Sequence, residues 1–151
     1  MIVPIYPYGE EILTKKSEDM DLDDPNLSDI IQNMYDTMRN TSMSIAIAAP
    51  QIGISKRIFI VDGDDESENG VFINPRILST SGYLNDFAEA CLSFPCDIRL
   101  HIKRPTIVEL EWYDEKKVYH KKFIGEFTAM VVQHEIDHLD GILMIDRTTE
   151  D

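Results

Sequence analysis

The residues best suited to chemistry lie near the end of the chain, where His134-Glu135-Ile136-Asp137-His138 forms an H-E-x-x-H pattern. On a helix, four residues span about 6 Å of rise and just over one turn, so both imidazoles project from one face and can reach one metal ion. The glutamate beside the first histidine can touch a metal-bound water without being a ligand, as a general base must. The pattern therefore predicts a hydrolytic metal site.

Three fixed letters arise by chance in many proteins, so the helix around them matters. We expect this helix from about Glu126 to Asp140, ending before Gly141, a residue type suited to the position after a helix. Its apolar face carries Phe127, Met130 and Val131 and continues into both histidines, which should therefore face inward. Buried imidazoles beside a carboxylate need polar partners, and a metal ion supplies one directly.

The third ligand should come from earlier in the chain. Gly141 fits the longer H-E-x-x-H-x-x-G-x-x-H pattern of some zinc proteases, but its last position is Met144, a poor ligand for a hard or borderline cation. Only 13 residues follow His138, too few for another helix with a distant glutamate. Cys91, 43 residues before His134, is the best candidate, the alternative being a cysteine that only packs in the core.

Three segments together resemble the peptide deformylase family. They are Ala48-Ala49-Pro50-Gln51, Glu89-Ala90-Cys91-Leu92-Ser93 and Gln133-His134-Glu135-Ile136-Asp137-His138. The family signatures are G-x-G-x-A-A-x-Q, E-G-C-L-S and Q-H-E-x-D-H, in this order and with similar spacing. The likeness extends over nearly the whole chain, from PIYPYGEEIL at the start to the closing QHEIDHLDGIL.

The resemblance implies the chemistry of the site. It implies that Cys91, His134 and His138 bind one divalent metal ion, with a water in the fourth position. Fe²⁺ is the expected ion, and Zn²⁺, Ni²⁺ or Co²⁺ can replace it. Glu135 would take the water proton and deliver it to the leaving amine. The implied activity is removal of the N-formyl group from N-formylmethionyl nascent peptides near the ribosome, with release of formate.

Other positions match further roles in the family. Gln51 and the backbone N–H of Leu92 match its donors to the developing oxyanion. Glu89 matches a position behind the ligands that fixes nearby groups. For Asp137 two interpretations stay open, one in which it fixes a histidine tautomer and one in which it is solvated.

The expected substrate cleft departs from the family pattern. Ser44-Ile45-Ala46 replaces G-x-G, and Ala90 replaces the glycine of E-G-C-L-S. Glycine serves where φ is positive or another backbone approaches closely, so the added methyl groups are expected to narrow the cleft. Ile45, Ala46, Ala90, Met130 and Val131 are the predicted substrate-binding residues, although core packing explains the last two equally well.

Two other functions compete with this prediction. The lost glycines suggest a deformylase relative with an altered substrate. The second competing function is that of a metal-bearing binding protein without catalytic turnover. Such a protein has no need of Glu135 beside an open metal position, or of Gln51.

Composition narrows the setting. A chain of 151 residues fits one domain, here 1–151. A formal net charge of −14 argues against direct nucleic-acid binding and against anionic membrane surfaces. The start of the chain does not read as a signal peptide, and no apolar run approaches the roughly 20 residues that span a bilayer. With only two cysteines, Cys91 and Cys96, we expect a cytoplasmic protein without a disulfide framework and treat Cys96 as packing or pocket rim.

The remaining elements indicate an α+β domain, with small antiparallel or mixed sheets packed around the C-terminal helix. Asp24 as N-cap and Pro25 as first helical residue predict a helix to Asn40. Strands are expected at 57–61, at 71–74 and in a hairpin of 106–113 with 118–124, and an acidic loop at 62–68. His101 and His120 are expected to be ordinary surface residues.

Overall fold

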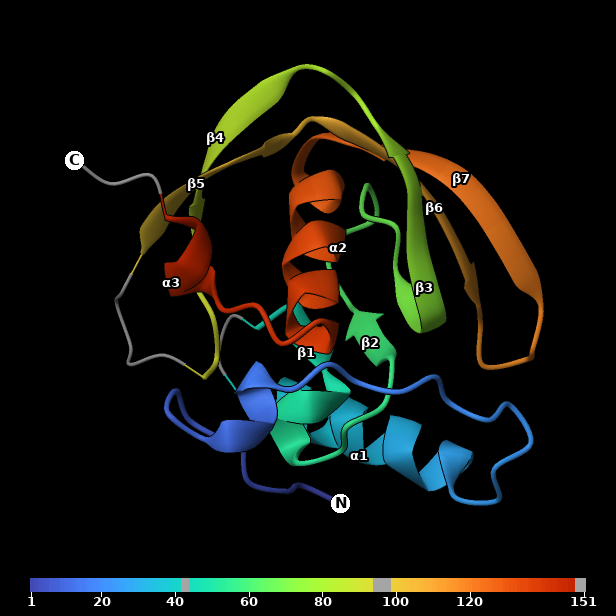
Figure 1. Ribbon diagram of the computed structural model, residues 1–151. Helices are drawn as coiled ribbons and strands as arrows, with labels where there is room; N and C mark the ends of the chain where they lie inside the picture. Colours follow the sequence, from blue (N-terminus) through green and yellow to red (C-terminus); the bar gives the residue numbers. More distant parts are fainter. Residues whose placement is uncertain (42–43, 94–98, 149–151) are drawn as a thin grey trace.

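The computed structural model describes residues 1–41, 44–93 and 99–148 of the chain and has an α+β architecture (Figure 1). Its elements in order are η1 (Glu11–Thr14), α1 (Leu27–Arg39), β1 (Ala46–Ala48), η2 (Ala49–Ile52), β2 (Ile58–Val61), β3 (Gly70–Thr80), β4 (Leu84–Glu89), β5 (Leu100–Pro105), β6 (Ile107–Tyr113), β7 (Tyr119–Gly125), α2 (Glu126–Leu139) and α3 (Met144–Arg147).

The larger sheet has the order β1-β2-β3-β6-β7, with every neighbouring pair antiparallel. Its two faces are set by the alternation of side chains along each strand. In β2, Phe59 and Val61 pack in the core cluster that contains α2, whereas Ile58 and Ile60 pack in the cluster that contains α1. Both faces are therefore covered at β2, and all four of its residues are buried.

The smaller sheet is the antiparallel hairpin of β4 and β5, which lies beside α2 (Figure 1). The sequence did not predict these strands, because β4 exposes most of its side chains and lacks an apolar alternation. After α2 the chain forms α3 and reaches β5, where Thr148 makes an isolated antiparallel bridge to Ile102. The C-terminal segment thus lies against the hairpin that carries Glu89.

Most predicted elements are confirmed, including α2, the β6–β7 hairpin and the acidic loop between β2 and β3. The predicted cap of α1 is wrong. The helix begins at Leu27 with Asn26 as N-cap, and Asp24 Oδ1 instead accepts a hydrogen bond from the backbone N–H of Asn26 at 2.8 Å. Asp24 therefore stabilises the turn before the helix.

The two histidines that were expected at the surface, His101 and His120, differ in burial. His101 is exposed on β5, as predicted. His120 is half-buried, lies 2.8 Å from Asp114 Oδ2 through its Nε2, and stacks on Trp112 with 5.0 Å between ring centroids. Across the described part of the chain, no helix is long and apolar enough to span a membrane.

Candidate metal centre

Helix α2 directs His134 and His138 into the interior, where 7% and 2% of their surfaces are exposed. Their ring centroids lie 5.1 Å apart with an interplanar angle of 68°. The spacing of one helical turn therefore places both imidazoles on the buried face, as the sequence predicts.

The end of α2 is fixed by Gly141, which has φ +73°. Its N–H bonds to the carbonyl of His138 at 3.2 Å, and the N–H of Ile142 bonds to the carbonyl of Asp137 at 2.8 Å. These two bonds form a Schellman motif, which satisfies carbonyls at the end of a helix. A Cβ at position 141 would lie 2.6 Å from the carbonyl oxygen of Thr14, so glycine also permits this close approach.

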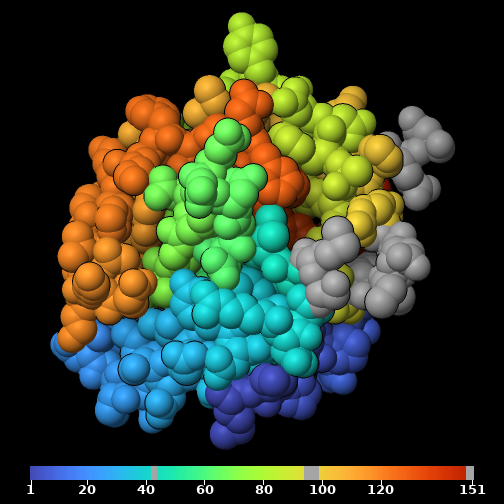
Figure 2. All heavy atoms as spheres, turned by 180° about the vertical axis from the view of Figure 1, so that it is seen from behind, coloured from blue at the N-terminus to red at the C-terminus, as the bar shows by residue number. Residues whose placement is uncertain are grey.

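Cys91 joins the histidines from the end of β4. Its Sγ lies 3.2 Å from Nε2 of His138. One ligand atom from each of Cys91, His134 and His138 lies within 4.8 Å of the others. Figure 2 shows a hollow between cyan atoms near the start of β1 and yellow-green atoms of the β4–β5 region, with red atoms of the C-terminal part of the chain visible inside it.

The donor set fits a divalent metal ion. One thiol and two imidazoles suit iron, zinc, cobalt or nickel better than magnesium or calcium, which prefer oxygen ligands. Glu135 Oε1 is buried and has no hydrogen-bond partner. An unpartnered carboxylate oxygen beside three metal-binding groups is what a site for a reacting water or substrate requires.

Glu89 lies directly behind His134. Its Oε1 is 2.8 Å from His134 Nδ1, and Arg104 donates to both oxygens of the same carboxylate, from Nε at 2.5 Å and Nη2 at 3.0 Å. Burial raises the pKa of Glu89, but hydrogen bonds from His134 and Arg104 outweigh burial and lower that pKa below its ordinary value. An ionised Glu89 holds the His134 ring so that Nε2 is available to a metal.

The negative groups concentrate around His134. Burial lowers the pKa of His134, but hydrogen bonds to Cys91 and Glu89 outweigh it and raise this pKa to about 10. Burial lowers the pKa of His138 well below its ordinary value. A metal ion that binds His134 competes with a proton there, because an imidazole must be deprotonated to act as a ligand.

Glu135 is 4% exposed, and its Oε2 lies 3.9 Å from His134 Nε2. Burial is the main cause that raises its pKa to about 7. A carboxyl group with a pKa near neutrality can both take up and return a proton under physiological conditions.

Gln51 reaches the site from η2 and is 1% exposed. Its Oε1 accepts a hydrogen bond from the N–H of Ala48 at 2.9 Å, and its Nε2 donates to Ser93 Oγ at 3.2 Å and contacts Cys91 Sγ at 3.5 Å. The amide is therefore oriented with its donor end toward the cysteine.

The N-terminal segment makes backbone hydrogen bonds to η2, which carries Gln51, and to the segment that carries Cys91 and Ser93. The N–H of Tyr6 bonds to the carbonyl of Gln51 at 2.7 Å, and the N–H of Tyr8 bonds to the carbonyl of Ser93 at 2.6 Å. Leu92, the other predicted oxyanion donor, lies between Cys91 and Ser93 and is half-buried.

The predicted cleft residues occupy different environments. Ile45, Ala46 and Met130 are partly buried against the same core cluster, in which Val131 is buried, whereas Ala90 is exposed after β4. Cys96 lies outside the described residues.

The replaced glycines do not occupy strained backbone. In the described part of the chain, positive φ outside glycine occurs at Asn74, Lys117 and Glu126. Ser44, Ala46 and Ala90 thus have φ values that ordinary residues adopt, so what these replacements change is the space that their side chains occupy.

Two arginines of this site, Arg104 and Arg147, were not predicted from the sequence. Asp137 is buried and contacts neither histidine ring; its Oδ2 accepts hydrogen bonds from Arg104 Nη1 at 2.8 Å and Arg147 Nε at 2.6 Å. The interpretation of Asp137 as solvated is therefore wrong, and any influence of Asp137 on a histidine ring is indirect, through Arg104 and Glu89. The sequence did contain a signal that Arg104 is buried, because it lies two residues after Ile102 and shares the inward face of β5 with it. A buried arginine in turn requires carboxylate partners.

Comparison with known proteins identifies the family. A family model described as Polypeptide deformylase matches residues 2–151. A peptide deformylase from Christiangramia forsetii is 38% identical over 162 residues, which cover 97% of this chain and 82% of that protein. One from Prosthecochloris aestuarii is 42% identical over 155 residues, which cover 97% and 80%.

Solved structures agree with this match. The crystal structure of peptide deformylase from Thermotoga maritima has a TM-score of 0.91 at 32% identity and covers 99% of both chains. A class I type b peptide deformylase from Acinetobacter baumannii, solved with Met-Ala-Ser bound, has a TM-score of 0.87 at 32% identity and covers 97% of this chain and 98% of that chain. These matches confirm the predicted fold and the resemblance. The chain belongs to the peptide deformylase family, metal-dependent hydrolases that remove the N-formyl group from nascent peptides.

Proposed function

We propose that Cys91, His134 and His138 hold one divalent metal ion and that Glu135 transfers the proton during hydrolysis of N-formylmethionyl peptides. The observation that carries this proposal is the convergence of three donors within 4.8 Å beside a buried carboxylate oxygen without a partner. Residues 1–151 are proposed to act as one catalytic domain.

We propose Fe²⁺ as the ion, with Zn²⁺, Ni²⁺ or Co²⁺ able to replace it. The mixed thiol and imidazole donor set supports this choice of metals. When bound, such an ion supplies a Lewis acid that polarises a carbonyl and acidifies water.

Glu135 has the position required for proton transfer. Hydrolysis adds OH from water to the formyl carbon, breaks the C–N bond and leaves formate and a free amine. In our proposal Glu135 accepts the proton from water and returns it to the leaving nitrogen, so that the peptide departs as an amine. Burial of Glu135 keeps this proton away from bulk solvent.

Gln51 and the backbone N–H of Leu92 are proposed to stabilise the negative charge that develops on the formyl oxygen. The fixed orientation of the Gln51 amide supports this role, because its Oε1 is held by Ala48 and only its NH₂ end points toward Cys91. A donor that is already oriented needs no reorganisation during the reaction.

The proposed substrate is a peptide that begins with formyl-methionine. Ile45, Ala46, Ala90, Met130 and Val131 are proposed to line its binding cleft. The relative from Acinetobacter baumannii with bound Met-Ala-Ser supports an N-terminal methionine in this fold. We further propose that the protein acts in the cytoplasm on nascent chains near the ribosome, without binding nucleic acid itself, in keeping with its formal net charge of −14.

Formate release from formyl-Met-Ala-Ser tests the proposal, with protein loaded anaerobically with Fe²⁺. Glu135→Gln preserves shape but removes the base, so we expect it to abolish formate release while metal content is unchanged. Full metal occupancy of the unaltered chain without formate release would contradict the proposed function.

A further inference from the structure

A continuous line of ion pairs leads from the surface to His134. Arg147 on α3, with 44% of its side chain exposed, donates from Nε to Asp137 Oδ2 at 2.6 Å. Arg104 donates to the same oxygen and also binds both oxygens of Glu89. Glu89 in turn contacts His134 Nδ1 at 2.8 Å.

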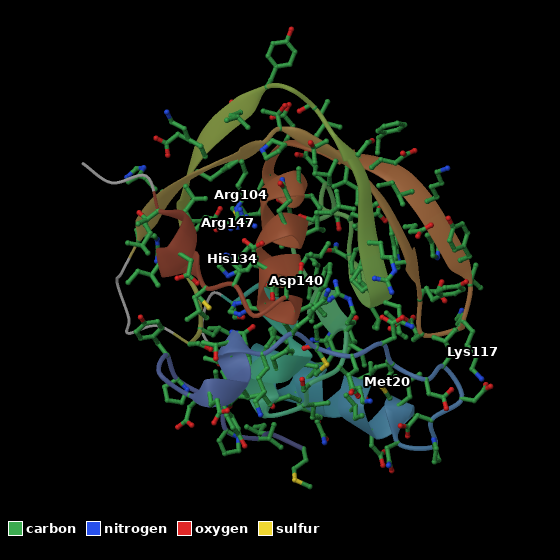
Figure 3. All side chains as sticks on the ribbon, in the orientation of Figure 1. Met20, Arg104, Lys117, His134, Asp140 and Arg147 are labelled. Atoms are coloured by element: carbon green, nitrogen blue, oxygen red, sulfur yellow. The ribbon has the colours of Figure 1, made fainter. Side chains whose placement is uncertain are left out.

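We infer that Arg147 is a positioning residue for the metal centre and acts through Asp137, Arg104 and Glu89. This inference rests on the proposed ligand role of His134. In Figure 3 the side chains of Arg147, Arg104 and His134 gather on one side of α2, between that helix and α3.

The charges of this line balance only when Arg147 is included. Two carboxylates, Glu89 and Asp137, face two guanidinium groups, Arg104 and Arg147. The two carboxylates and Arg104 are all buried, so each loss of a partner leaves a charge that solvent cannot compensate. Without Arg147, Arg104 alone must satisfy both carboxylates, and its hold on Glu89, and thereby on the His134 ring, weakens.

The neighbouring residues Asp146 and Thr148 hold Arg147 in place. Thr148 forms an antiparallel bridge with Ile102 on β5, and its Oγ1 donates to the carbonyl of His101 at 3.3 Å. At the start of α3, Asp146 accepts a hydrogen bond from the N–H of Leu143 at 2.9 Å. Arg147 is therefore fixed between the hairpin that carries Glu89 and the helix that carries His134.

The test measures loss of metal to a chelator from protein loaded with Co²⁺. Replacing a residue directly behind a ligand typically costs about 10- to 100-fold in metal affinity. Arg147 is three contacts further from His134 than Glu89 is, so we expect a smaller effect, with Arg147→Gln releasing Co²⁺ about three- to tenfold faster. The visible absorption of bound Co²⁺ should also change, because the His134 ring is less firmly oriented. Arg76→Gln is the matched control, since Arg76 is 51% exposed and also paired with an aspartate, Asp19, but lies outside this line.

The conservative variant Arg147→Lys retains a cation that can donate to Asp137, so its release rate should fall between those of the unaltered chain and Arg147→Gln. Circular dichroism establishes that each variant is folded. Equal release rates and spectra for Arg147→Gln and the unaltered chain would overturn the positioning role alone. Failure of the unaltered chain to bind Co²⁺ would instead overturn the proposed metal site.

Discussion

Glu89 and His134 lie 45 residues apart in the sequence, yet the carboxylate Oε1 of one is 2.8 Å from Nδ1 of the other. This contact joins the β4–β5 hairpin to α2 at the proposed metal site. It selects the tautomer of His134 in which the proton is on Nδ1 and Nε2 is free to bind a metal.

Glu89→Gln tests the importance of this contact. The amide can still accept a hydrogen bond from Nδ1, but it cannot neutralise Arg104, so we expect metal affinity to fall by about tenfold or more. Competition with a coloured chelator measures the affinity. Glu66→Gln, an exposed change in the loop after β2, is the control and should leave affinity unchanged.

The features predicted correctly from sequence are those that short-range patterns determine. The spacing of His134 and His138, the buried Val131 before them and the glycine after them locate α2, its buried face and its end. Phe127, which was expected on the same face, is instead 51% exposed. The β6–β7 hairpin follows similarly from alternating side chains around a turn. In each case the residues that predict the element lie within it or directly beside it in the sequence.

The missed features depend on contacts between distant segments. β4 becomes a strand through pairing with β5 rather than through its own composition. The partners of Asp137 come from 33 residues before it and 10 after it, and no local pattern joins Arg104 to Arg147. The alternation of side chains along β5 indicates that Arg104 faces inward and needs a carboxylate partner. It does not identify which carboxylate that is.

Gln51 offers a prediction about rate rather than metal. Gln51→Glu keeps an oxygen that accepts the N–H of Ala48 but removes the donor, so kcat should fall by roughly 10²- to 10³-fold, the usual cost of one oxyanion donor. Gln51→Ala should lose similar activity and also stability, by about 1–3 kcal/mol, because the Ala48 N–H is left unsatisfied. Formate release, metal analysis and urea unfolding measure these effects. Loss of metal in Gln51→Glu would contradict a role confined to the oxyanion.

Gly141 offers a prediction about stability. Gly141→Ala places a Cβ at φ +73° and 2.6 Å from the carbonyl oxygen of Thr14, so we expect the free energy of unfolding to fall by more than about 1 kcal/mol. Gly82→Ala is the control, since an added Cβ there meets nothing within 4 Å. Urea midpoints of the two variants measure the difference, and equal midpoints would show that the end of α2 adjusts without cost.

Metal removal should affect stability as well as activity. A ligand that binds only the folded chain stabilises it by about 2.7 kcal/mol at 100 times its Kd, so adding Co²⁺ to chelator-treated protein should raise the unfolding temperature. Cys91→Ser removes the thiolate and should lose most of this rise, because a hydroxyl binds such ions weakly. Ca²⁺, which prefers oxygen ligands, is the control cation and should give no rise. The same Co²⁺-dependent rise in Cys91→Ser and in the unaltered chain would mean that the ion binds elsewhere.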